Sequence, residues 1–319
     1  MKVFSMFSGI GGFDLAMRNL GHEIIGACEI DKYARQVYAR HFPGVPIHND
    51  ATQVSPESLP QFDVLCAGFP CQAFSIAGKR RGFEDTRGSL FFEIARVAKE
   101  KKPSILLLEN VKGLLSHDKG ETFRTIISTL DEMGYDAEWQ LLNSKYFVPQ
   151  NRERIFIVGH RRGQRARQVF PLGEFNPKNN IKIKKLNQAR QGYRVYDTSG
   201  IGQTLAANAG GFGAKMGLIA IPTLTPDRED KRQNGRRFKE NGEPAFTLNT
   251  QDRHDIFDGT RIRKLTPTEC ERLQGFPDDW TKYDNDGNIV SDTQRYKCCG
   301  NAVTVPVVQY IASHFEFPS

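Results

Sequence analysis

The sequence predicts an α/β fold, with a sheet covered by helices on both faces, followed by a smaller irregular β-rich domain. Short apolar runs alternate with segments of helical periodicity through residues 1–160. Beyond them the periodicity gives way to Gly, Asn, Lys, Arg and turn dipeptides. Strands and helices that alternate at this spacing are typical of a parallel, doubly wound sheet. A chain of 319 residues is long enough for one such domain and a second, smaller one.

Six apolar runs are predicted to be strands, and three segments between them are predicted to be helices. The strands are expected at residues 3–6, 23–28, 64–67, 105–108, 138–142 and 155–158, and the helices at 32–41, 89–101 and 121–133. Short strands are expected at 217–221 and 245–248. A helix is predicted to follow Thr266, an N-capping residue type with Pro267 after it, and to end at Gly275. The run 307–315 predicts a last helix that docks onto the first domain.

Composition indicates a soluble globular protein, with 39% hydrophobic and 25% charged residues. The cysteines, at positions 28, 66, 71, 270, 298 and 299, form no paired CxxC spacing. We therefore expect no metal site and no disulfide scaffold, and reduced thiols in a cytosol. No run approaches the ~18 to 20 apolar residues of a membrane span, and no cleavable signal is recognisable, so no membrane association is predicted.

Positive charge is concentrated in one segment. The net charge is +7, but residues 161–194 contain ten Lys or Arg and a single acid, Glu174, so this segment carries +9 and the rest −2. A basic segment joined to a nearly neutral body is typical of a surface that binds a polyanion. The alternative is a solvated linker.

A glycine-rich turn follows the first predicted strand, at Phe7-Ser8-Gly9-Ile10-Gly11-Gly12. Glycines at a strand-to-helix turn allow a ligand close to the backbone, and Glu29, after the next strand, could bond the hydroxyls of a ribose. Asp50, after a third strand candidate, could reach an adenine amino group or could cap a turn. Asp14 stands where a dinucleotide fingerprint would have a third glycine, so the turn is not that fingerprint, and by itself it leaves a nucleoside site as one of two open interpretations.

Cys71 and Glu109 each follow a buried strand. Because such strand ends share one edge of a sheet, a thiol and a carboxyl group are predicted to lie there together, which favours covalent catalysis with an acid. Burial should raise the pKa of Glu109. The alternatives are a buried structural cysteine and a glutamate that caps backbone groups. Arg152 and Arg154 should point the same way from an extended segment, toward a carbonyl or phosphate group or toward Glu109. Residues 78–88 form a candidate lid.

Six blocks in this order resemble the DNA (cytosine-5) methyltransferases, closely the bacterial type II modification enzymes, over essentially the whole chain. The blocks are Phe7 to Gly11, Gly68-Phe69-Pro70-Cys71-Gln72, Glu109-Asn110-Val111, Gln150-Asn151-Arg152-Glu153-Arg154, Arg263-Lys264-Leu265-Thr266 through Gln274-Gly275-Phe276-Pro277, and Gly300-Asn301-Ala302-Val303. The resemblance implies a Rossmann-like catalytic domain of residues 1–165 and 300–319, a target-recognition domain of 166–262, and a connecting region of 263–299.

The same resemblance implies S-adenosylmethionine as the methyl donor and assigns roles to the matching positions. The expected cofactor contacts are Phe7, Gly9, Ile10, Gly11, Gly12, Glu29, Ile30, Asp50, Ala51, Pro70, Leu90, Asn301 and Ala302. Ile30 departs from the aromatic residue that relatives can carry against the adenine. Cys71 is the implied nucleophile and Glu109 the acid at the ring nitrogen of cytosine. Arg154, with Arg152, is expected to hold the carbonyl oxygen of the base.

Double-stranded DNA is the implied partner of a monomeric enzyme in a bacterial or archaeal cytoplasm, associated with the nucleoid. Base flipping must expose the cytosine, and a cognate restriction endonuclease is the implied counterpart. DNA contacts are expected at Gln72, Ser75, Ala77, Lys79, Arg87, Gln191, Arg194, Gln203, Lys215 and Arg253, and His254 also has the capacity to read a base edge. The alternatives are an RNA cytosine-5 methyltransferase, a non-catalytic DNA-binding protein on the same fold, and a nicotinamide oxidoreductase.

Overall fold

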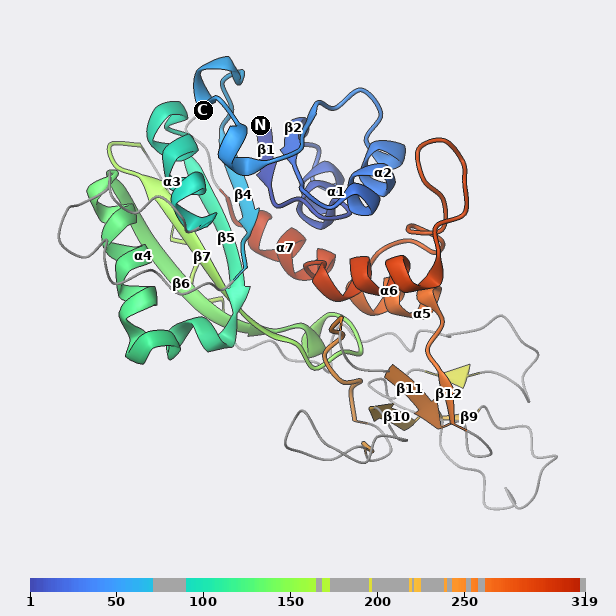
Figure 1. Ribbon diagram of the computed structural model, residues 1–319. Helices are drawn as coiled ribbons and strands as arrows, with labels where there is room; N and C mark the ends of the chain where they lie inside the picture. Colours follow the sequence, from blue (N-terminus) through green and yellow to red (C-terminus); the bar gives the residue numbers. More distant parts are fainter. Residues whose placement is uncertain are drawn as a thin grey trace.

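A seven-stranded sheet with helices on both faces forms the body of the protein (Figure 1). The computed structural model describes residues 1–70, 90–164, 168–172, 195–196, 218–219, 221–224, 238–239, 243–250, 254–257 and 262–315. The strands of the sheet are β1 (Lys2–Met6), β2 (Glu23–Cys28), β3 (Ile47–His48), β4 (Val64–Gly68), β5 (Ile105–Val111), β6 (Tyr135–Asn143) and β7 (Glu153–Arg161). Their order is β3-β2-β1-β4-β5-β7-β6. The order reverses between β1 and β4, which is where open α/β sheets bind ligands.

The sheet is mixed, so the prediction of an all-parallel sheet was wrong for one strand. β7 pairs antiparallel with both β5 and β6, whereas β1, β2, β3, β4 and β5 pair in parallel. An apolar run shows that a strand is buried but carries no information about its direction. The reversal brings the start of β7 to the edge where the parallel strands end.

The helices of the body divide between the two faces. They are α1 (Gly12–Asn19), α2 (Lys32–His41), α3 (Leu90–Lys101), α4 (Glu121–Glu132) and α7 (Val305–Ala312), with 3-10 turns η1 (Ala51–Gln53), η2 (Pro56–Ser58), η5 (Lys112–Leu115), η6 (His117–Gly120) and η7 (Ser144–Tyr146). Along β4, Val64 and Cys66 pack with α1, α2 and α7, while Leu65 and Ala67 pack with α3 and α4. This alternation follows from the two-residue period of a strand. Because both faces are covered, the strands read as continuous apolar runs.

The C-terminal part of the chain returns to the body, as the sequence predicts. Figure 1 shows α7 beside α1 and the β4 side of the sheet, and both helices contribute to one apolar core. The preceding elements are α5 (Pro267–Gln274), with the predicted Thr266 cap and Gly275 at its end, and α6 (Asp292–Asn301), which the sequence does not predict. Phe276 and Trp280 also enter the core of the body, so residues 263–299 are more than a connection.

The second domain is described only in short pieces. Its strands are β8 (Val195–Tyr196), β9 (Leu218–Ile219), β10 (Ile221–Leu224) and β11 (His254–Phe257), and β12 (Ile262–Lys264) completes a sheet with β10 and β11 below α5 and α6 in Figure 1. The strand predicted at 245–248 is wrong, since only Ala245 forms an isolated bridge, to Gln150. Residues 168–172 pack on the body, where Glu138 accepts hydrogen bonds from the Val169 and Phe170 amides and Gln140 accepts one from the Leu172 amide.

No helix in the described part of the chain is both long and apolar enough to cross a membrane. Within the same residues no group of three or more His, Cys, Asp or Glu side chains is placed to hold a metal ion.

Candidate active site

A pocket opens at the carboxyl ends of β1, β2, β4 and β5, at the point where the strand order reverses. Its volume is about 410 Å³, within the range of small-molecule sites. Most of the predicted cofactor contacts line it: Phe7, Gly9, Glu29, Ile30, Asp50, Ala51, Pro70, Leu90 and Asn301. Glu109, Arg152 and Arg154 line the same pocket, so the predicted cofactor and catalytic side chains are brought together.

The turn after β1 has a backbone conformation that few residues adopt. Phe7 has φ of 56° and Gly9 has φ of 55°, both in the left-handed region. A Cβ on Gly9 would meet nothing within 4 Å, so this glycine leaves open space on the pocket side. The left-handed Phe7 costs free energy on the order of 1 to 3 kcal/mol and persists because the surrounding fold holds it. Such strain is typical of a ligand-binding turn.

Three of the predicted cofactor contacts in this turn do not line the pocket. Ile10 is buried in the core of the body. A Cβ on Gly11 would lie 2.5 Å from the Phe42 ring, and a Cβ on Gly12 would lie 2.7 Å from a methyl group of Val303. These glycines are therefore needed for close packing around α1. Ala302, also predicted to bind the cofactor, is buried and outside the lining.

Glu29 stands at the end of β2 and ties the glycine-rich turn to that strand. Its Oε2 accepts a hydrogen bond from the Gly9 amide and its Oε1 accepts one from the Asp31 amide, each at 2.8 Å. Arg35 donates to the carbonyl oxygens of Glu29 and Ile30, at 3.0 and 2.6 Å. The Ile30 side chain is 71% exposed at the pocket, which leaves apolar area for a ligand to cover.

Asp50 both caps a turn and lines the pocket, so the two interpretations of its sequence context are compatible. Its Oδ1 accepts hydrogen bonds from the amide and the hydroxyl of Thr52, at 2.9 and 2.8 Å. Ala51 follows in the pocket lining, and its carbonyl oxygen accepts a hydrogen bond from Arg96 of α3 at 3.0 Å. The helix that begins at Leu90 thus braces the corner on which Asp50 lies.

Glu109 and Arg154 form an ion pair in the pocket. Nε of Arg154 lies 3.0 Å from Oε1 of Glu109, and the two side chains are only 16% and 12% exposed. The antiparallel pairing of β7 with β5 places Arg154 opposite Val111, two residues beyond Glu109. An ion pair shielded from water is held more firmly than one at the surface. Glu109 therefore is not the isolated carboxyl group that its apolar strand suggests.

Asn110 links the acid to the segment that precedes Cys71, a role the sequence analysis missed. Its side chain is buried, its Nδ2 donates to the carbonyl of Phe69 at 2.8 Å, and its Oδ1 accepts from the Val111 amide at 2.8 Å. Phe69 and Pro70 are thus held beside Glu109. Cys71 is bonded to Pro70 but lies outside the described residues.

Arg152 is used differently from Arg154. It is 3% exposed, and it donates to the backbone carbonyls of Leu248 (2.9 Å), Gly300 (3.4 Å) and Ala302 (2.9 Å). Burial, and after it the neighbouring Arg154 charge, lowers the pKa of Arg152 to about 9. Its Nε has no partner among the described residues. The sequence predicts that both arginines hold one group, but in the structure their partners differ.

The other lining residues were also missed: Cys28, Gly68, Phe69, Asn110, Val111 and Gly300. All lie within or directly beside the blocks and strand ends that the sequence analysis recognised, so position at a strand end was the available signal. Burial first, and then the Glu29 and Asp50 carboxylates, raise the pKa of the Cys28 thiol to about 12. Cys28 therefore stays a neutral thiol at physiological pH and contributes shape to the pocket.

The predicted DNA contacts Gln72, Ser75, Ala77, Lys79, Arg87, Gln191, Arg194, Gln203, Lys215 and Arg253 lie outside the described residues. His254 lies on β11, where its side chain is buried and its Nε2 accepts a hydrogen bond from the Asn249 amide at 3.3 Å. His254 thus supports the fold in this structure instead of presenting its ring to a base.

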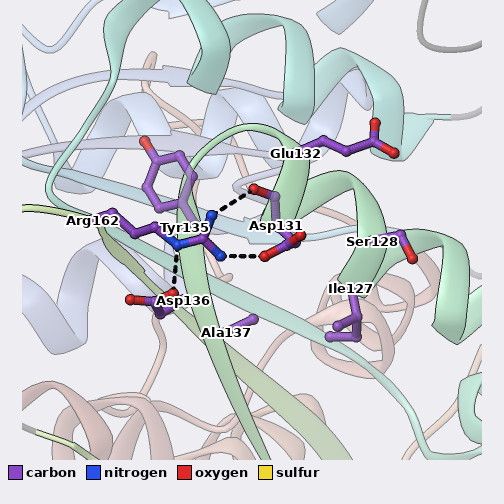
Figure 2. A pocket seen from close by; sticks show the side chains of 8 residues that line it. All are labelled: Ile127, Ser128, Asp131, Glu132, Tyr135, Asp136, Ala137 and Arg162. Atoms are coloured by element: carbon purple, nitrogen blue, oxygen red, sulfur yellow. Dashed lines mark hydrogen bonds and ion pairs between the residues drawn. The ribbon is translucent and has the colours of Figure 1, made fainter.

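A larger surface hollow, of about 550 Å³, lies at the other edge of the sheet, where β6 begins (Figure 2). Figure 2 shows Arg162 enclosed by Asp131 and Asp136, with Nε of Arg162 2.7 Å from Oδ1 of Asp136. Both aspartate side chains are about two-thirds exposed, at 67% and 68%. Exposed pairs of this kind contribute little to stability, and the Arg162 guanidinium of this lining is already paired with both aspartates. The smaller pocket, at the strand ends, is therefore the candidate active site.

The sheet order and the pocket define an α/β protein of the class that binds nucleotide-like ligands beyond the carboxyl ends of its strands. An acid and arginine pair, each with only a small exposed fraction, completes one side of that pocket. The chain belongs to the family of C-5 cytosine-specific DNA methylases, whose sequence model matches residues 1–316. The resemblance drawn from the six sequence blocks is thereby confirmed.

Individual relatives cover nearly the whole chain. The orphan methyltransferase M.SPRI of Bacillus phage SPR is 36% identical, with 98% of this chain and 96% of the relative aligned. The type II methyltransferase M.HhaI of Haemophilus parahaemolyticus is 34% identical, over 98% and 93% of the two chains. Among solved structures, Schizosaccharomyces pombe Dnmt2 matches with a TM-score of 0.63 at 20% identity, over 98% of this chain and 97% of that one. At that identity the likeness shows the fold alone.

Proposed function

We propose that this protein transfers a methyl group from S-adenosylmethionine to carbon 5 of a cytosine within a short duplex DNA sequence. The observation that carries the proposal is the shared pocket. Glu29 and the open space at Gly9 lie on one side of it, and the Glu109–Arg154 pair and Pro70, the neighbour of Cys71, lie on the other. Family membership supports the reaction, and the positions of these residues support their roles.

The cofactor side of the pocket fits an adenosine. A carboxylate at the end of the second strand of a Rossmann-like sheet suits ribose hydroxyls, and each oxygen of Glu29 has a second lone pair beyond its bond to a backbone amide. Ile30 offers exposed apolar area to a flat base, and Asp50 lies close enough to line the same space. S-adenosylmethionine would supply an electrophilic methyl group on a sulfonium and leave as S-adenosylhomocysteine.

The chain's own residues activate the base. Carbon 5 of cytosine is a weak nucleophile, so the Cys71 thiolate adds to carbon 6 and breaks the aromatic conjugation. Glu109 provides a proton or hydrogen bond to the ring nitrogen, and Arg154 binds the carbonyl oxygen, so the charge that develops on the ring is stabilised. After carbon 5 has gained its methyl group it loses its proton, and the departing thiolate restores the ring.

The base must leave the duplex for this chemistry. Unstacking and unpairing cost a few kcal/mol, which contacts to the backbone and to the orphaned partner base must offset. The basic segment 161–194 and residues 78–88 are the proposed source of those contacts. We propose a monomer acting on duplex DNA in the cytoplasm, protecting the same sequence that a cognate restriction endonuclease cuts. The type II names of relatives such as M.HhaI support the protective role.

Bisulfite sequencing of DNA from cells that express this chain tests the proposal, because it reports activity, target base and sequence context together. We expect cytosines at one position of a short sequence to resist bisulfite conversion. An endonuclease of that specificity should no longer cut the DNA. In vitro, transfer of a labelled methyl group to duplex DNA should exceed transfer to tRNA. Labelling of tRNA alone would support the RNA methyltransferase instead, and no transfer to either would support a non-catalytic protein.

A further inference from the structure

The start of β7 lies at a junction of three segments that are distant in the sequence. Through one guanidinium, Arg152 bonds the carbonyl of Leu248, in the predicted target-recognition domain, and the carbonyls of Gly300 and Ala302, at the end of α6. Gly300 and Ala302 flank Asn301, which lines the pocket on its cofactor side. A single buried side chain therefore joins the described part of the second domain to the pocket wall.

Two further features tighten the same junction. Gln150 accepts the amide of Leu248 at 2.9 Å through Oε1 and donates to the carbonyl of Leu273 at 2.8 Å through Nε2. A Cβ on Gly300 would lie 2.9 Å from the carbonyl carbon of Asn249 and 3.0 Å from its oxygen. Backbone cannot yield as a flexible side chain can, so only glycine lets α6 pack this closely against the segment 245–250.

The neighbouring arginine has a different set of contacts. Arg154 meets the Glu109 carboxylate at 3.0 Å and the carbonyl of Glu153 at 2.8 Å. Among the described residues, the side-chain hydrogen bonds of Arg152 go instead to backbone carbonyls, and the residue is almost without exposed area. A buried guanidinium is costly unless its N–H groups are bonded, so these three carbonyls hold Arg152 in place, and Arg152 holds them.

We propose that Arg152 is a positioning residue that couples the DNA-reading domain to the cofactor side of the pocket, whereas Arg154 alone contacts the reacting base. The inference rests on the proposed function, because it needs both a cofactor and a duplex. A duplex bound by the second domain acts on Leu248, and Arg152 transmits the change to the residues around Asn301. By linkage, DNA then changes cofactor affinity, and the cofactor changes DNA affinity by the same factor.

The test measures the dissociation constant of S-adenosylhomocysteine with and without a duplex that carries the methylated sequence. Wild type should bind it about tenfold more tightly with the duplex, a typical coupling. The coupling ratio, which is the dissociation constant without the duplex divided by the one with it, should fall to about one in Arg152→Met. Arg152→Lys, with one ammonium for three carbonyls, should restore part of this ratio. In Arg154→Met the turnover number should fall at least about a hundredfold, as for loss of a transition-state donor, with the ratio unchanged.

Gly300→Ala provides an independent variant if Arg152→Met does not fold, which thermal denaturation would show. It should also reduce the ratio toward one, because the added methyl group pushes Asn249 away while Arg152 stays intact. Gly113→Ala is the control, since its Cβ would meet nothing closer than 3.9 Å, and it should keep the wild-type ratio.

Several outcomes would overturn the coupling. The first is a wild-type ratio of one, and the second is an unchanged ratio in both Arg152→Met and Gly300→Ala. The third is a lower turnover number in Arg152→Lys with its ratio intact, which would place Nε of Arg152 on the base. A wild-type protein that neither binds S-adenosylhomocysteine nor methylates duplex DNA would instead refute the proposed function. The two failures are therefore distinguishable.

Discussion

The two walls of the pocket are assembled in different ways. The cofactor wall, formed by Phe7, Gly9, Glu29, Ile30 and Asp50, depends on short-range contacts. Glu29 reaches Asp31 two residues away and Gly9 twenty residues away, and Asp50 reaches Thr52.

The catalytic wall, formed by Phe69, Pro70, Glu109, Asn110 and Arg154, depends on contacts between distant segments. Asn110 reaches Phe69 across 41 residues, and Arg154 meets Glu109 only because β7 runs antiparallel to β5. The hydrogen bonds cited for the cofactor wall span at most twenty residues, whereas the catalytic wall depends on strands and loops that are about forty residues apart. We therefore expect changes in the cofactor wall to affect cofactor binding, and changes in the catalytic wall to affect turnover.

The largest effect is expected from Cys71→Ala, which should abolish methyl transfer while cofactor and DNA binding remain. The thiolate is needed to make carbon 5 nucleophilic but not to hold either ligand. Wild type should become covalently trapped on duplex with 5-fluorocytosine at the target, because fluorine cannot leave as the proton does. A denaturing gel measures the adduct. An adduct still formed by Cys71→Ala would assign the nucleophile to another cysteine, and methylation by wild type without any trapping would overturn the covalent mechanism.

Glu109→Gln should lower the turnover number by about 10²- to 10⁴-fold, the usual range for loss of a positioned acid, with cofactor affinity nearly unchanged. The amide can still accept a hydrogen bond from Arg154, so the pocket should keep its shape. Single-turnover kinetics and calorimetric titration separate the two quantities. Glu153→Gln is the control, since Glu153 pairs with Lys112 near the surface. Equal losses in both variants would contradict a special role for Glu109.

Glu29→Ala should weaken cofactor binding by about 10- to 150-fold, since a charge-assisted hydrogen bond contributes roughly 1.5 to 3 kcal/mol. The sequence alone predicts little effect on folding, but Glu29 also holds the amides of Gly9 and Asp31, so a lower melting temperature is expected as well. Calorimetry and thermal denaturation measure the two effects. Glu23→Ala, at the exposed start of β2, should change neither. Unchanged cofactor affinity in folded Glu29→Ala would remove this residue from the site.

A fourth variant neutralises Lys182, Lys184 and Lys185 together, which lie outside the described residues. We expect weaker binding to target and non-target duplexes alike, and a smaller salt dependence, because each lost phosphate contact reduces the log–log slope by about 0.9. Fluorescence anisotropy over a range of salt concentrations measures this. Loss of discrimination with an unchanged slope would mean that these lysines read bases.

Asp14, on α1 behind the cofactor wall, should affect stability and not turnover. Burial raises the pKa of Asp14 to about 6, although Tyr38 donates to it at 3.0 Å. The folded protein thus binds this proton more tightly than the unfolded chain. The stabilisation that protonated Asp14 contributes is therefore present at low pH and is lost as pH rises through about 6. Relative to Asp14→Asn, wild type should lose up to about 3 kcal/mol between pH 4 and 7.

Urea denaturation of wild type and Asp14→Asn across that pH range measures the difference. Asp118→Asn, at an exposed turn, should show none of it. A gap between wild type and Asp14→Asn that stays constant with pH would mean that Asp14 is ionised in the folded protein throughout.

Much of the body could be predicted because its signals are local. β2 and α2 begin and end where the apolar periodicity places them, and the capped helix α5 begins after Thr266. Acids and glycines at strand ends are also local signals, so they indicated the position of the pocket. The direction of β7 and the existence of α6 escaped prediction. Burial does not reveal direction, and the sequence of α6 has little amphipathic pattern to recognise.

The sequence by itself determined the family, the order of its blocks, and the residue types that stand at each strand end. Those residue types set which protons and hydrogen bonds each side chain can offer. Only the tertiary structure decided where these capacities are used. Gly11 and Gly12 serve packing, Arg154 meets an acid, and Arg152 is committed to backbone carbonyls up to 150 residues away. A hydrogen bond needs its partner within about 3 Å, and sheet pairing and core packing select that partner from distant parts of the chain.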